Sequence, residues 1–165
     1  MSLNKQLTNE LNRLGAFSAS SPQTVSLSAP DQVDIAIDFL TVDSMSCAFR
    51  EIRLNVPSLV GAGFDALKQW AENLCSRVTY LLENIGPLEL DPDSGQVLIR
   101  SVPPDAQSDT TRFYEIILQS HADGNFSLRR YRSDRSGREQ VEIQATHEVL
   151  GKLVNDLVET ITRTA

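Results

Sequence analysis

The chain has 165 residues, of which 41% are hydrophobic and 22% are charged, and its formal net charge at pH 7 is −7. These values are typical of one globular domain with a hydrophobic core, and the length is too short for two ordinary domains. The negative charge argues against broad nucleic-acid binding, because a duplex repels an acidic surface unless basic residues cluster. No apolar run is long enough to span a membrane, and no secretory signal pattern is present, so we expect a cytoplasmic protein.

The first 32 residues predict a short helix followed by a linker. Leucines at spacings of three and four indicate an amphipathic helix over residues 1–15, with Gly15 as its stop: Leu3, Leu7, Leu11 and Leu14. Such a helix is too short to be stable alone, so it must dock on its own domain, on a second copy or on a partner. Residues 16–32 are rich in Ser, Ala and Pro and predict a polar linker with an edge strand at 24–27. The four leucines are therefore candidate partner contacts.

Residues 33–165 are expected to form a single α+β domain. Clean alternation of apolar and polar residues predicts a half-buried strand over 33–39. In the next strand the apolar positions change parity between Phe49 and Ile52. Either a bulge lies near Phe49 and Arg50, or both faces of this strand are partly covered.

An apolar stripe at helical spacing predicts a long central helix from Phe64 to Ile85, closed by Gly86 and Pro87. The only tryptophan, Trp70, lies within this stripe and is expected to fill the core. Cys75 lies beside the stripe, so we expect a buried, reduced thiol. Cys47 and Cys75 offer no disulfide framework, and nothing in the sequence argues for an oxidising compartment.

The second half predicts a series of hairpins and a last helix. A three-residue loop with a left-handed Gly124 joins the strands 112–120 and 125–132, and residues 101–111 are expected to be a polar loop. Thr146 is expected to cap the last helix, with Arg163 near its end. The predicted cross-strand pairs are Leu90 with Val97, Leu88 with Ile99, Leu118 with Leu128, Ser120 with Phe126, Arg130 with Val141, Arg132 with Glu139, Leu128 with Ile143, and Phe126 with Ala145.

Hairpins joined by short loops, without regular strand–helix alternation, predict an α+β fold. We expect an antiparallel sheet with the central and the C-terminal helix packed on one face, plus the short N-terminal helix. This order of elements is similar to that of secretion-type chaperones, at the level of architecture alone and without a shared motif. The similarity implies that an exposed apolar groove or sheet edge binds an extended segment of a partner.

Five arginines within ten residues form a candidate anion contact: Arg129, Arg130, Arg132, Arg135 and Arg138. The anion would be a phosphate, a carboxylate, a nucleic acid or an acidic peptide. Strand alternation weakens this hypothesis, because Arg130 and Arg132 share one face whereas Arg129 points to the other. Cross-strand pairing with nearby glutamates would also neutralise several of these charges: Glu115, Glu139 and Glu142.

Other motifs are incomplete. Residues 91–95 resemble the start of a calcium loop, but Val102 stands where a bidentate glutamate is needed. Residues 61–63 resemble a fragment of a phosphate loop without its lysine. His121 and His147 belong to no spaced metal-ligand set. The sequence therefore predicts no catalytic, cofactor or metal site.

The main functional hypothesis is a non-enzymatic protein-binding, adaptor or chaperone-like module that binds a protein partner or a second copy as a homodimer. An alternative is a small-ligand sensor or enzyme with a pocket between sheet and helices, lined by Tyr114, Arg130 and Arg132. A third hypothesis is a weak nucleic-acid contact through the hairpin 129–138.

Overall fold

The computed structural model describes residues 1–107, 109–121 and 124–161. Its helices are α1 (Leu3–Leu14), α2 (Phe64–Arg77) and α3 (His147–Glu159). Its strands are β1 (Phe17–Ala29), β2 (Val33–Val42), β3 (Ser46–Asn55), β4 (Ile85–Asp91), β5 (Gln96–Ser101), β6 (Asp105–Gln107), β7 (Thr110–Gln119), β8 (Phe126–Asp134), β9 (Gly137–Val141) and β10 (Ile143–Thr146). No helix in these three ranges is both long and apolar enough to cross a membrane.

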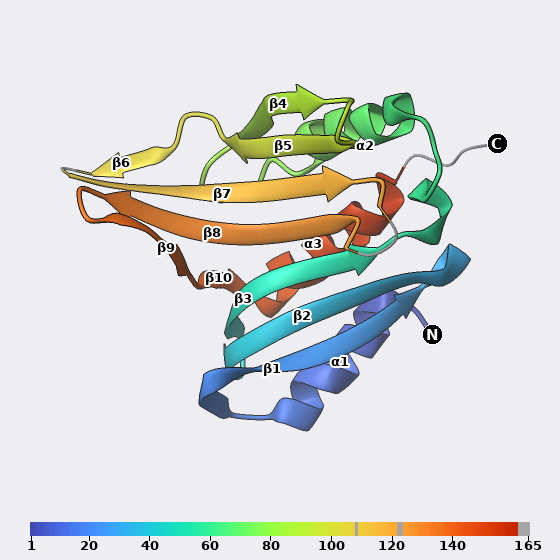
Figure 1. The fold of residues 1–165 in the computed structure, drawn as a ribbon. Helices are drawn as coiled ribbons and strands as arrows, with labels where there is room; N and C mark the ends of the chain where they lie inside the picture. Colours follow the sequence, from blue (N-terminus) through green and yellow to red (C-terminus); the bar gives the residue numbers. More distant parts are fainter. Residues whose placement is uncertain (108, 122–123, 162–165) are drawn as a thin grey trace.

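All the strands belong to one antiparallel sheet with the order β1-β2-β3-β8-β7-β5-β4, while β6 pairs with β7, β9 with β8 and β10 with β3. The three helices lie on the same side of this sheet (Figure 1). The predicted α+β class, with an antiparallel sheet covered by helices on one face, is therefore confirmed.

The sheet forks between β3 and β8. These strands pair only through residues 52–54 and 126–128, and beyond that point β9 pairs with β8 whereas β10 pairs with β3. On β3, Phe49 pairs with Phe39 and Ile52 with Ile37, so two residues of β3 lie opposite one residue of β2. This is the predicted bulge, and it bends β3 away from β8. As a result Ile143 pairs with Phe49, and the predicted pairs of Ile143 with Leu128 and of Ala145 with Phe126 are wrong.

The N-terminal helix docks on its own domain. Leu3, Leu7 and Leu11 are buried in the core, and Leu14 packs against it. The helix contacts β1 and α3, and the Gln6 side chain exchanges two hydrogen bonds with the Ser28 backbone.

The predicted linker at 16–32 is mostly a strand, because residues 17–29 form β1 and pair with β2. Val25 and Leu27 point into the core, while the residues that alternate with them, Thr24, Ser26 and Ser28, are exposed. Pro22 falls where the pairing between Ser18 and Gln23 is interrupted, which is where an edge strand tolerates proline. The predicted edge strand at 24–27 is confirmed as part of β1, which is the edge strand of the sheet, whereas the strand's serine-rich first half was predicted as linker.

The central helix ends at Arg77, eight residues before its predicted end. Val78 and Thr79 are β-branched and favour extended backbone. The chain then leaves the helix, and the Tyr80 hydroxyl donates to Asp156 Oδ2 at 2.7 Å on α3. Val78 remains buried, so the apolar stripe continues into the core from an irregular segment. Trp70 is fully buried as predicted, and its Nε1 donates to Thr160 Oγ1.

Asn125 makes the loop between β7 and β8 longer than predicted. Its side-chain nitrogen donates to the carbonyls of Gln119 and His121, and its Oδ1 accepts from the Val56 backbone at 2.7 Å. The prediction of a left-handed Gly124 is confirmed, while residues 122 and 123 of this loop lie outside the described residues. The loop shifts the pairing by two residues, so the predicted pairs of Leu118 and Ser120 are replaced by Leu118 with Phe126 and Ile116 with Leu128.

The other predictions for the second half had mixed outcomes. Three predicted pairs are confirmed: Leu90 with Val97, Arg130 with Val141, and Arg132 with Glu139. A register shift at Leu88 places Pro87 opposite Ile99 instead of Leu88. The predicted polar loop 101–111 contains β6 and the start of β7, although residue 108 lies outside the described residues.

At the C-terminus, Thr146 caps α3 as predicted, by accepting from the Val149 backbone, while Arg163 lies outside the described residues. The cysteines Cys47 and Cys75 are free, and Cys75 is half-buried rather than fully buried as predicted. Burial raises the pKa of the Cys47 thiol to about 12 and that of Cys75 to about 11.

Candidate functional site

A cavity of about 550 Å³ opens beside the fork between β3 and β8. We call it the fork cavity, and its lining combines arginines with apolar and amide side chains. The lining residues are Leu40, Arg50, Leu82, Arg112, Tyr114, Arg130, Gln140, Val141, Glu142 and Gln144. They come from β2, β3, β7, β8, β9, β10, the segment between β9 and β10, and the segment between α2 and β4.

Arg130 is the most buried charge of this cavity, with only 6% of its side chain exposed. Its Nη2 lies 3.2 Å from Glu83 Oε2, and its Cζ lies 4.3 Å from the centre of the Tyr114 ring. Its Nη1 has no hydrogen-bond partner in the part of the chain that the structure describes. A buried donor without a partner costs about 1–3 kcal/mol. A ligand acceptor at Nη1 would recover this cost.

A short hydrogen-bond chain fixes the position of Arg130. Ser101 accepts a hydrogen bond from the Tyr114 backbone at 2.7 Å, and its hydroxyl donates to Glu83. Glu83 in turn holds Arg130 against the Tyr114 ring. Burial raises the pKa of the Tyr114 hydroxyl, against the opposing effect of the Arg130 charge. Tyr114 therefore stays neutral at pH 7, and its ring gives the guanidinium a rigid face on which to lie.

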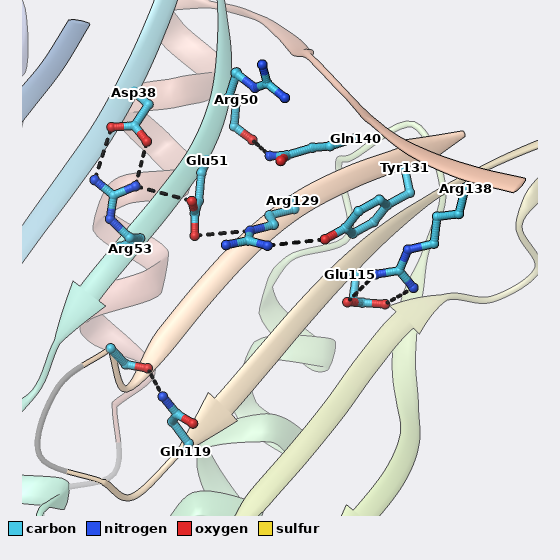
Figure 2. Close-up of polar contacts among 11 residues, drawn as sticks. Asp38, Arg50, Glu51, Arg53, Glu115, Gln119, Arg129, Tyr131, Arg138 and Gln140 are labelled. Carbon is cyan, nitrogen blue, oxygen red and sulfur yellow. Dashed lines mark hydrogen bonds and ion pairs between the residues drawn. The ribbon is translucent and has the colours of Figure 1, made fainter. Parts of the chain in front are cut away.

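Two further arginines of the cavity, Arg50 and Arg112, make no side-chain hydrogen bond or ion pair within the described ranges. Figure 2 shows the Arg50 guanidinium away from the neighbouring ion pairs, while its backbone carbonyl accepts from Gln140. Every other arginine of the described residues is ion-paired to a carboxylate. Arg50 and Arg112, which have no ion pair, therefore line the same cavity as Arg130, whose buried Nη1 has no hydrogen-bond partner.

Other arginines are used within the fold itself. On the face of the sheet away from the helices, polar side chains form a row of ion pairs, hydrogen bonds and one cation–π contact, that of Arg138 on the Tyr131 ring. The row runs through Asp38, Arg53, Glu51, Arg129, Tyr131, Arg138 and Glu115 (Figure 2). Arg132 pairs with Asp134 and Glu139, and Arg135 lies 3.9 Å from Asp109. The predicted neutralisation by Glu115 and Glu139 thus occurs, whereas Glu142 accepts a hydrogen bond from Gln144.

The five predicted anion contacts are thus distributed over several places, and Arg130 alone lines the fork cavity. Of the predicted pocket residues, Tyr114 and Arg130 line it, while Arg132 lines a neighbouring hollow. Sequence reasoning missed Arg50 and Arg112. Arg112 shares the face of Tyr114 by strand alternation, which is a signal that could have found it. Arg50 lies on the bulge, so its direction depends on tertiary structure.

In comparisons with protein-family models, with curated proteins and with solved structures, no significant match was found. Within the described residues, no group of three or more His, Cys, Asp and Glu side chains is arranged to hold a metal ion. His147 Nε2 lies 3.1 Å from the Ser46 carbonyl, so this side chain contacts the backbone of β3.

Proposed function

We propose that this protein binds a small organic anion in the fork cavity, as a ligand-binding protein or sensor. The observation that supports this proposal is that Arg50, Arg112 and Arg130 line one cavity, in a chain whose other described arginines are ion-paired, and that Arg130 Nη1 has no hydrogen-bond partner. Against these three positive charges stand two carboxylates, Glu83 behind Arg130 and Glu142 in the lining. The net charge of this group of side chains is therefore +1, which an anionic ligand can neutralise.

A carboxylate with an apolar body fits this lining best. The planar guanidinium group presents paired donors that match the two oxygens of a carboxylate. Leu40, Leu82 and Val141 supply apolar surface beside these donors, which an inorganic ion would leave exposed. We therefore expect the cavity to prefer an organic carboxylate to inorganic phosphate, and added salt to weaken binding because charge drives it.

Arg50→Ala is expected to weaken the binding of hexanoate by about 10- to 100-fold, because a hydrogen bond to a charged group contributes about 1.5–3 kcal/mol and Arg50 lines the fork cavity without an ion pair. Isothermal titration calorimetry with hexanoate and with inorganic phosphate measures the effect. Arg135→Ala is the matched control, because it removes the same charge from a side chain that is 90% exposed and outside the cavity. Equal losses in the two variants would indicate a diffuse charge effect, and no binding by the unaltered protein would refute the proposal.

The protein-binding hypothesis stays a prediction, and the structure changes how it must be tested. Leu3, Leu7 and Leu11 are buried against the protein's own core, so they are available to a partner only if α1 leaves the sheet. Deletion of residues 1–30 would remove α1 and β1 and thus part of the core. Surface substitutions are the suitable probe, and two exposed apolar side chains of β4 offer positions for them: Leu88 and Leu90.

A further inference from the structure

A second hollow, of about 230 Å³, adjoins the fork cavity. It is lined by Asp105, Gln107, Thr110, Arg112 and Arg132. Arg112 lines both spaces, so this residue lies at the boundary between them. The two spaces therefore offer one ligand two neighbouring binding regions.

Two like charges face each other in this second hollow. Arg112 on β7 and Arg132 on β8 are direct cross-strand partners. Like charges in directly opposite positions of an antiparallel pair repel, which destabilises the sheet unless an anion lies between them. Asp105 is the register partner of Arg112 on β6, but it makes no ion pair with either arginine.

The counterions of Arg132 leave part of its guanidinium free. Its Nη2 lies 3.4 Å from Glu139 and 3.6 Å from Asp134, and the Glu139 side chain is 64% exposed. Its Nε is buried and has no hydrogen-bond partner among the described residues. A ligand oxygen near Arg112 and Arg132 would pair with donors that the fold does not use.

The spacing of the two regions follows from strand geometry. Arg130 and Arg132 lie two residues apart on β8, so they point to the same face with their backbones about 7 Å apart. Tyr114 and Arg112 stand opposite them on β7, on the same face. A positive charge thus recurs along this face at an interval that an extended aliphatic chain can match.

We propose that the ligand of this site is an aliphatic dicarboxylate, with one carboxylate at the free Nη1 of Arg130 and the other between Arg112 and Arg132. This inference rests on the proposed function, because it extends the same cavity into the second hollow. The second carboxylate relieves the repulsion of the facing arginines, and the chain between the two groups lies along the apolar lining. A monocarboxylate of the same length makes only the carboxylate contact with Arg130 and none between Arg112 and Arg132.

The test compares dicarboxylates with monocarboxylates of equal chain length by isothermal titration calorimetry. The pairs are glutarate with pentanoate, adipate with hexanoate, pimelate with heptanoate, and suberate with octanoate. We expect at least one dicarboxylate to bind about tenfold more tightly than its monocarboxylate, because a second charged contact is made. Arg132→Ala should weaken dicarboxylate binding about tenfold more than monocarboxylate binding and so remove this advantage, whereas Arg135→Ala should preserve it.

Two results would overturn the inference, and they are distinguishable. If monocarboxylates bind as tightly as every dicarboxylate, or if Arg132→Ala weakens both classes equally, the second region does not exist and the proposed function remains. If no member of either series binds, both the inference and the proposed function fail.

Discussion

Glu83→Gln is expected to lower the free energy of unfolding by about 3 kcal/mol, because removing one partner of a buried ion pair leaves the other charge uncompensated. Both side chains of the pair are more than nine-tenths buried, and the carboxylate also accepts from Ser101. The same substitution adds one positive charge to the fork cavity. We therefore expect hexanoate to bind Glu83→Gln more tightly than the unaltered protein, and to restore part of the lost stability.

Urea unfolding with and without hexanoate measures both effects. The double variant with Glu83→Met and Arg130→Met is the control, since apolar side chains of similar volume can replace a buried ion pair without loss of stability. It should be more stable than Glu83→Gln and should not respond to hexanoate. If Glu83→Gln were as stable as the unaltered protein and bound hexanoate no better, the buried pair would have neither of the roles assigned to it here.

Leu7→Ala is expected to lower the free energy of unfolding by about 2–5 kcal/mol, because it leaves a cavity in a packed core. The Leu7 side chain is only 2% exposed, and it packs in the main hydrophobic cluster with residues of the sheet. A leading helix on a free tether would instead lose almost nothing. The substitution thus measures whether α1 is part of the domain.

Thr8→Ala is the matched control for this helix, because Thr8 is exposed and lies next to Leu7. A surface substitution of this kind should change stability by less than about 0.5 kcal/mol. Urea unfolding followed by far-ultraviolet circular dichroism compares the two variants. Equal stabilities of Leu7→Ala and Thr8→Ala would contradict the docked helix and would make its leucines available to a partner.

Local patterns predicted most elements of this fold but not all their ends. Alternation located β2, and the Thr146 cap located the start of α3, because both depend on neighbours in sequence. The end of α2 was wrong because the apolar stripe continues after the helix stops, through Val78 in an irregular segment. Burial of a residue at helical spacing does not require a helix.

Register could not be predicted where distant residues determine it. The pairing of β7 with β8 depends on Asn125, whose side chain accepts from the backbone of Val56, 69 residues earlier. The partner of β10 depends on the bulge in β3, which opens space for a strand from the other end of the chain. Both effects appear only when the tertiary structure is formed.

The candidate site was predicted only in part, because some of its features depend on local sequence and others on distant residues. Arg130 and Tyr114 were expected in a pocket because strand alternation places them on the covered face of the sheet. The count of charges in the hairpin 129–138 was less informative, because Arg129 and Arg138 pair with glutamates on the other face. The site is distinguished by arginines that have no carboxylate as an ion-pair partner. Whether an arginine has such a partner depends on residues that are distant in the sequence.

The most direct test of the proposed anion site is a crystal structure of the protein with hexanoate. We expect the carboxylate in the fork cavity, with one oxygen within hydrogen-bond distance of Arg130 Nη1 and the aliphatic chain against Leu40, Leu82 or Val141. Hexanoate bound elsewhere, or a fork cavity filled by the protein's own side chains with Arg50 and Arg112 paired to carboxylates, would contradict this account.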